Sequence, residues 1–204
     1  MLAYMFLADG FEEVEALTTA DILIRAGVTV KLVKLPVECG NAEGTNEKNE
    51  GTNFGKCKSA RGSHNIRIKP DLTLGLDVTK EDLLDGDCVI LPGGMPGTKN
   101  LATSSDVVYL IKEYAKLGKK VAAICAAPSV LGENGLLQGK RATCFPGNEE
   151  KLLGATVESV GAVTDGNIIT GKSMGSAVTF GLAVAKALMG EEAANKVEAS
   201  IYRG

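Results

Sequence analysis

The stretch Lys119-Lys-Val-Ala-Ala-Ile-Cys125-Ala-Ala-Pro-Ser-Val-Leu131 is the part of this 204-residue chain that best indicates its fold. A short apolar run with strand character leads directly into a cysteine, and a helical pattern begins at about residue 127. The small residues on both sides of Cys125 permit a tight strand-to-helix turn, which would present the thiol at the carboxyl end of the strand. A strand that passes directly into a helix in this way is typical of α/β proteins.

The same alternation of strand and helix patterns continues along the chain in both directions. We expect strands at 1–8, 28–35, 87–91, 120–124 and 141–145, a hairpin of 157–163 and 167–170, and helices at 13–26, 104–117, from about 127, 175–189 and 191–199. In the first helix, apolar residues at positions 14, 17, 20, 23 and 24 predict the buried face. Continuous apolar strands separated by helices indicate an α/β fold with a mostly parallel sheet covered on both faces. Such sheets bind ligands at the carboxyl ends of their strands.

Composition excludes several classes of protein. The length fits one domain spanning 1–204, and 22 basic against 25 acidic residues give a net charge of −3, so we expect no nucleic-acid partner. The apolar runs are too short for a membrane span, and no signal peptide is recognisable. The five cysteines form no C-x-x-C pair, which predicts reduced thiols and a cytoplasmic location. With one histidine in the chain, we expect no metal site and no cofactor.

The segment 38–63 interrupts the alternation. Its one large apolar residue is Phe54, among Gly, Asn, Glu and Lys residues. Such a composition buries too little apolar area to offset the entropy of ordering, so we predict a flexible surface insertion in the single domain. A superficial phosphate-loop motif, Gly51-x-x-x-Gly55-Lys56-Cys57, has one residue too few between its glycines and ends in Cys. We therefore give it no functional meaning.

Cys125 is the leading candidate for chemistry. The N–H groups and positive dipole at the start of the following helix would favour its thiolate form. The alternative is an inert cysteine that behaves as a small apolar side chain. Gly93 and Gly94, after another predicted strand, could present backbone N–H groups to an oxyanion, although paired glycines often form only a turn.

Three carboxylates, Glu12, Glu13 and Glu15, follow the first predicted strand. Carboxylates are favourable in the first turn of a helix in any case, which is the simpler interpretation. Glu15 precedes the apolar face and could instead reach across the end of the sheet towards Cys125. A carboxylate there would raise the pKa of the thiol, so a useful Glu15 must be neutral when the thiolate forms.

These motifs, in this order, resemble the DJ-one/ThiJ/PfpI superfamily, whose members are relatives of class I glutamine amidotransferases. The matching segments are Ala8–Ala16, Leu91–Gly94, Ala122–Pro128, Thr143–Pro146 and Thr170–Gly181. The resemblance implies a flavodoxin-like (Rossmann-type) α/β sandwich that forms a homodimer. It also implies that Cys125 is an oxidisable nucleophile, that Glu15 is its hydrogen-bonding carboxyl, and that Gly93, Gly94 and Ala126 are the backbone donors.

The resemblance further implies positions in the site or in a dimer contact for Glu12, Asp21, Arg25 and Arg61. The chain also departs from relatives at two positions. Protease-type members have a His directly after the cysteine, where this chain has Ala126, so a Cys-His peptidase is disfavoured. DJ-one members have a His with a role in glyoxalase chemistry where this chain has Phe145, so such activity would rest on Cys125 and Glu15 alone.

Two functions fit the same reactive thiol. In the first, Cys125 attacks small α-oxoaldehydes or glycated adducts, as in a cofactor-free glyoxalase or protein deglycase, while Glu15 transfers protons. In the second, the protein is a non-enzymatic redox sensor or chaperone whose Cys125 is oxidised to the sulfinate. A role in thiamine-precursor synthesis, suggested by older family naming, has no support in these residues.

Overall fold

A mostly parallel β-sheet forms the centre of the computed structural model, which describes residues 1–36 and 59–202. The order across this sheet is β10-β11-β7-β6-β1-β2-β5, and only the β10–β11 pair is antiparallel. Its strands are β1 (Leu2–Leu7), β2 (Thr29–Lys34), β5 (Leu72–Thr73), β6 (Cys88–Leu91), β7 (Lys120–Ile124), β10 (Ala162–Asp165) and β11 (Ile168–Gly171). Two short ribbons lie outside it, β3 (Ala60–Arg61) with β4 (Arg67–Ile68) and β8 (Arg141–Ala142) with β9 (Thr156–Val157).

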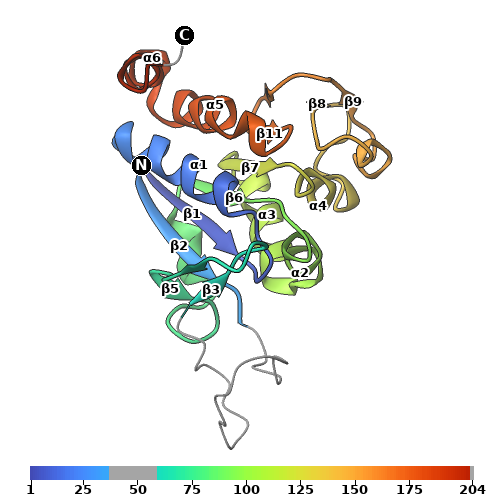
Figure 1. Cartoon of the computed structure of the whole chain (residues 1–204). Coiled ribbons are helices and arrows are strands. Elements are labelled where there is room, and N and C mark those ends of the chain that lie inside the picture. Colours follow the sequence, from blue (N-terminus) through green and yellow to red (C-terminus); the bar gives the residue numbers. More distant parts are fainter. Residues whose placement is uncertain (37–58, 203–204) are drawn as a thin grey trace, which may run out of the picture.

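Helices cover both faces of the sheet (Figure 1). They are α1 (Glu13–Arg25), α2 (Gly97–Thr103), α3 (Ser105–Lys116), α4 (Pro128–Glu133), α5 (Ala177–Met189) and α6 (Glu191–Ser200), with short 3-10 turns at Asp82–Asp85, Glu149–Lys151 and Met174–Ser176. Helices α1, α5 and α6 pack on one face, and α2, α3 and α4 pack on the other. The α/β class and the layered arrangement predicted from the strand–helix alternation are therefore confirmed.

Two hydrophobic cores result from the alternation of side chains along each strand. In β1, Tyr4 and Phe6 face the core under α3, whereas Ala3, Met5 and Leu7 face the core under α1 and α5. Successive side chains of a strand point to opposite faces, so a strand buried on both sides must be apolar throughout. This explains why β1 and β6 are continuous apolar runs in the sequence, whereas β2, which is less buried, also contains lysines.

The structure corrects some of the predicted elements. The hairpin exists, but its first strand begins at Ala162, while Thr156–Val157 form β9 and pair with β8. The predicted strand at 141–145 is only Arg141–Ala142, and α2 was not predicted. Most of the predicted insertion, residues 38–58, lies outside the described residues. Its last part does not behave as an exposed insertion, because Ala60 is fully buried and Arg61 pairs with β4.

The buried face of α1 agrees with the prediction only in part. Ala20 and Leu23 are buried as predicted, but Val14, Leu17 and Ile24 are exposed by 45%, 41% and 59%, and Glu15 and Ile22 are buried. The helix is rotated because its inner face packs closely against α5, where Cβ of an alanine at Gly181 would lie 3.0 Å from Ile22. The apolar spacing alone could not distinguish this face from its neighbour. Within the described part of the chain, no helix has the length and apolarity needed to cross a membrane.

Candidate active site

Cys125 lies at a strained turn directly after β7. Its φ angle is +65°, in the left-handed region that residues other than glycine rarely adopt. The turn is held on both sides, because the Cys125 N–H donates to the Gly171 carbonyl at 2.9 Å and its own carbonyl accepts from Phe145 N–H at 2.8 Å. Strain of this kind persists only where the surrounding structure fixes it, and it is concentrated at functional sites. The predicted strand-to-helix elbow is therefore present.

The other described cysteines lack this environment. Cys88 lies within β6, is fully buried, and burial raises the pKa of its thiol far above the ordinary value. Cys144 is also buried, and burial raises its pKa to about 11. Cys125 alone among these three is partly exposed. Cys39 and Cys57 lie outside the described residues.

Glu15 reaches Cys125 from the first turn of α1. Its side chain is completely buried, and its carboxyl lies beside Cys125, since a Cβ at Gly93 would lie 2.7 Å from Oε2 of Glu15 and 2.6 Å from Cβ of Cys125. The Gly93 N–H donates to Oε2 of Glu15 at 2.8 Å, whereas Oε1 has no hydrogen-bond partner among the described residues. The carboxyl therefore lies within the site and is not a helix-end charge in solvent.

Gly93 and Gly94 have different roles. The sequence suggested that both would donate to the reacting group, but the Gly93 N–H is used to hold Glu15. The N–H groups of Gly94 and Ala126 lie at the Cys125 sulfur. A side chain at Gly93 does not fit, because its Cβ would lie 2.6 Å from Cβ of Cys125 and 2.7 Å from Oε2 of Glu15.

The protonation of Glu15 and Cys125 is coupled. Burial raises the pKa of Glu15 from 4.5 to about 7, against the lowering effect of its hydrogen bonds with Cys125 and Gly93. Burial, followed by the charge and hydrogen bonding of Glu15, raises the pKa of Cys125 to about 12, although the N–H groups of Ala126 and Gly94 lower it. The expected stabilisation of the thiolate by backbone N–H groups is thus present but outweighed. The pair loses its first proton from Glu15, and the resulting carboxylate can accept the thiol proton.

A cavity of about 510 Å³ opens beside the thiol. Its lining combines the backbone donors Gly94 and Ala126 with polar side chains and the large apolar side chains of Met95 and Phe145. Volumes of this size accommodate small organic ligands, with a few polar groups to orient them. Neither Met95 nor Phe145 was singled out as a candidate wall of the cavity, because nothing local in the sequence places them beside Cys125.

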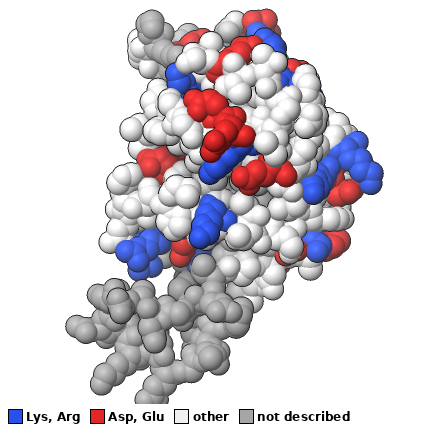
Figure 2. All heavy atoms as spheres, turned by 90° about the vertical axis from the view of Figure 1, so that its right-hand side faces the viewer, with Lys and Arg blue, Asp and Glu red and all other residues white. Residues whose placement is uncertain are grey.

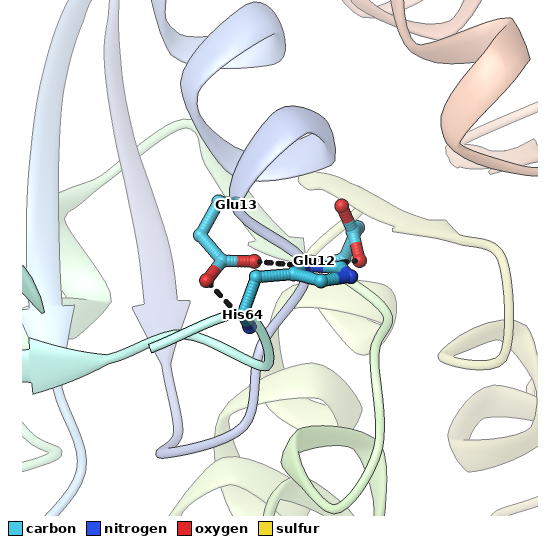
Figure 3. A group of neighbouring side chains, drawn as sticks. All are labelled: Glu12, Glu13 and His64. Carbon is cyan, nitrogen blue, oxygen red and sulfur yellow. Dashed lines mark hydrogen bonds and ion pairs between the residues drawn. The ribbon is translucent and has the colours of Figure 1, made fainter. Parts of the chain in front are cut away.

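Glu12, Glu13 and His64 form a second group beside the site (Figure 3). Glu13 accepts from the His64 backbone N–H at 2.7 Å, from the Ile66 N–H at 3.3 Å, and bonds the His64 ring at 2.9 Å. Burial acts to raise the pKa of Glu13, but these hydrogen bonds outweigh it and lower the pKa to about 2. The hydrogen bond between Glu13 and the His64 ring raises the pKa of His64. The negative charges of Glu12 and Glu13 add to this rise.

These three residues are the group in the described part of the chain that could hold a metal ion, since each offers a ligand atom within 4.8 Å of the others. The oxygens of Glu13 are, however, already used to hold the loop that contains His64 and Ile66. We therefore interpret Glu13 as the residue that fixes this loop to α1. Glu12 lies between the loop and the site, because its N–H donates to Gly93 at 2.9 Å and its carboxylate accepts from Ser63 at 3.2 Å.

Two of the remaining candidates lie further along α1, and the third contributes backbone hydrogen bonds among the described residues. Asp21 and Arg25 are exposed and form an ion pair of 2.7 Å one turn apart on α1. Asp21 lies six residues beyond Glu15, which is about 9 Å along the helix. Arg61 acts through its backbone, with its N–H donating to Asp9 at 3.0 Å and its carbonyl accepting from the Gly10 N–H at 2.7 Å.

Known proteins share this fold and part of this sequence. A family model described as the DJ-1/PfpI family matches residues 1–187. The chain is 34% identical to Protein dj-1beta of Drosophila melanogaster over 197 residues, which cover 96% of this chain and 93% of that protein. A mutant of a DJ-1 superfamily protein from Salmonella typhimurium has a TM-score of 0.82 and 28% identity, covering 100% of this chain and 98% of that chain. Toxoplasma gondii DJ-1, solved in an oxidised form, has a TM-score of 0.79 and 27% identity, covering 98% and 97%.

Proposed function

The chain belongs to the DJ-1/PfpI family, and from this premise we propose that it is a carbonyl-stress enzyme that converts small α-oxoaldehydes or glycated adducts without a cofactor. The observation that carries the proposal is the contact between the strained, partly exposed Cys125 and the fully buried Glu15. A nucleophile paired with a carboxyl of raised pKa is the combination that acid–base and covalent catalysis requires. We further propose a cytoplasmic location.

The proposed reaction begins when Cys125 attacks the aldehyde carbon. The C–S bond forms, the thiol proton passes to the Glu15 carboxylate, and Glu15 then gives this proton to the former carbonyl oxygen, which becomes the hydroxyl of a hemithioacetal. The N–H groups of Gly94 and Ala126 lie beside the sulfur and would stabilise negative charge on that oxygen. Glu15 then takes the proton from the first carbon and returns it to the second, while the hydroxyl proton moves from the oxygen of the first carbon to the ketone oxygen of the second. The product is a thioester of a 2-hydroxy acid. Water hydrolyses the thioester and frees the thiol.

A direct test compares methylglyoxal consumption by the wild type and by Cys125→Ser. We expect Cys125→Ser to lose essentially all activity, while Cys88→Ser retains it as the control for a buried cysteine. Glu15→Gln should also lose most activity, because the amide cannot accept the thiol proton. Equal consumption by the wild type and Cys125→Ser would show that the thiol is not the nucleophile.

A redox sensor is the second candidate, and the surroundings of the sulfur favour it specifically. Two peroxide molecules would convert the thiolate to a sulfinate with release of two waters, and the N–H groups of Gly94 and Ala126 together with protonated Glu15 could hold the added oxygens. The relative from Toxoplasma gondii was solved in an oxidised form. Loss of methylglyoxal turnover with accumulation of a stable Cys125 sulfinate under mild peroxide would favour the sensor over the enzyme.

We also propose that two copies of the chain associate through α1. DJ-1 family proteins are generally dimeric. In this chain Val14, Leu17 and Ile24 expose apolar surface on one helix, and Asp21 and Arg25 lie exposed on the same helix. We infer that these exposed apolar side chains become covered in the dimer. Light scattering coupled to gel filtration would measure the mass of the assembly directly.

A further inference from the structure

The cavity beside Cys125 is larger than the smallest α-oxoaldehydes require. Its volume is about 510 Å³. Methylglyoxal has only five non-hydrogen atoms, which need on the order of 150 Å³ at about 30 Å³ for each water-sized group. The remaining space could accommodate a substantial substituent on the ketone side of the substrate.

Two exposed apolar side chains border this space. Met95 is 61% exposed and Phe145 is 46% exposed, although both are large, and both line the cavity. Ala102 adds a further apolar contact to the lining. Exposed apolar side chains in a concave site gain free energy when a ligand covers them, and aromatic rings prefer to pack against other rings.

Both apolar walls are held in place by the backbone close to the thiol. The Phe145 N–H donates to the Cys125 carbonyl at 2.8 Å, and the Asn148 N–H donates to the Phe145 carbonyl at 3.1 Å. Met95 follows Gly94, whose carbonyl accepts from the Thr98 N–H at 2.9 Å. The backbone beneath these side chains is therefore fixed before a ligand binds, which lowers the entropy cost of binding.

The charged side chains that line the cavity discriminate between ligands less strongly than its apolar walls do. Lys99, Lys151 and Glu133 all line the cavity and all are exposed, so both signs are present. Figure 2 likewise shows acidic and basic side chains interspersed on the side of the molecule that carries α2 and α4. Exposed charges of mixed sign are screened by salt and solvent and discriminate weakly between ligands.

Thr98 supplies a polar group within this lining. The residue is 5% exposed, and its hydroxyl finds no hydrogen-bond partner among the described residues. Its oxygen is itself buried and does not face the open space of the cavity, so this hydroxyl is not a contact for the ligand and the apolar walls carry the selectivity.

We propose that this cavity selects α-oxoaldehydes that carry an aromatic substituent, with the aldehyde at Cys125 and the ring between Met95 and Phe145. This inference rests on the proposed function and names its substrate class. The chemistry at Cys125 and Glu15 is the same as for the smaller aldehyde. Discrimination comes only from the apolar contacts, which methylglyoxal is too small to make.

The test compares kcat/KM for phenylglyoxal and methylglyoxal in the wild type, Phe145→Ala, Met95→Ala and Leu76→Ala. Leu76 is a matched control because it is 63% exposed and does not line the cavity. Since phenylglyoxal differs in intrinsic reactivity, the informative quantity is the change in the ratio of the two values between variants. We expect Phe145→Ala to lower the phenylglyoxal-to-methylglyoxal ratio about tenfold, the scale on which apolar pockets discriminate, and Leu76→Ala to leave it unchanged. An unchanged ratio in both Phe145→Ala and Met95→Ala, or faster turnover of the anionic glyoxylate than of phenylglyoxal, would overturn the inference.

A second measurement separates this inference from the proposed function, because it needs no turnover. The rate at which Cys125 is alkylated by N-phenyl iodoacetamide, relative to iodoacetamide, should fall about tenfold in Phe145→Ala and not in Leu76→Ala. If neither aldehyde is consumed but this ratio falls, the enzymatic function fails and recognition of an aromatic group beside Cys125 stands. If the aldehydes are consumed by a Cys125-dependent reaction and both ratios are unchanged, only the inference fails.

Discussion

Replacing Glu15 by Gln should make the folded protein more stable at alkaline pH. The unfolded chain releases the Glu15 proton near pH 4.5, whereas the completely buried carboxyl of the folded protein keeps it until about pH 7. Between these values the unfolded state binds fewer protons, so the stability that depends on this group falls as pH rises and is fully lost above the folded pKa. Over the interval from 4.5 to about 7, at about 1.4 kcal/mol per pH unit, the loss is about 3 kcal/mol.

Glutamine is neutral in both states and does not carry this penalty. It also keeps an oxygen that can accept the Gly93 N–H, so the shape of the site is largely preserved. We therefore expect Glu15→Gln to raise the free energy of unfolding by up to about 3 kcal/mol near pH 8 and to have little effect near pH 4. Urea unfolding followed by circular dichroism at several pH values measures this difference directly.

Glu13→Gln is the matched control, because Glu13 is also buried, lies in the same turn of α1, and has the opposite shift. Hydrogen bonds lower its pKa from 4.5 to about 2, so its stabilisation is present above pH 4.5 and is lost as pH falls towards 2. Glu13→Gln should therefore destabilise the protein by about 3 kcal/mol at neutral pH, an effect that disappears in acid. If Glu15→Gln were neutral or destabilising at pH 8, Glu15 would not be a buried carboxyl with a raised pKa, and its assignment to the site would be wrong.

Three further outcomes follow from the same geometry. Mild peroxide should modify Cys125 before the fully buried Cys88, as judged by peptide mass spectrometry, and earlier modification of Cys88 would contradict the elbow assignment. Gly93→Ala should lower kcat/KM for methylglyoxal by about 100-fold, because the new Cβ must displace Cys125 or the Glu15 carboxyl. Circular dichroism should show that the variant is folded, and wild-type activity in a folded variant would show that this packing is unimportant. Leu17→Glu, a change of an exposed residue, should convert the proposed dimer to a monomer in light scattering, and an unchanged mass would exclude α1 as the interface.

Much of the fold was accessible from the sequence, because it depends on short-range periodicity. A strand buried on both faces, such as Leu2–Leu7, appears as an unbroken apolar run, and the turn after it carries its own Gly or small residues. Position 125 was identifiable for the same reason, since a strand, a cysteine and a helix occur in immediate succession. The exposed face of α1 was not identifiable. Spacing shows that apolar residues form a stripe, but packing against α5 decides which side of the helix becomes buried.

The roles of individual polar groups depended on contacts between distant segments. Glu13 and Glu15 lie two residues apart and look alike in the sequence, yet one has its pKa lowered by a loop 51 residues away and the other has its pKa raised by burial beside Cys125. Gly93 holds Glu15 instead of donating to the thiol, and Phe145 is placed at the cavity by a hydrogen bond to the Cys125 backbone. Sequence thus determined which residues lie at the carboxyl ends of the strands, because that placement follows from local pattern. Only the tertiary structure decided which of them are buried, which share protons and which remain open to a ligand, because pKa values and burial are set by neighbours that the chain brings together from far apart.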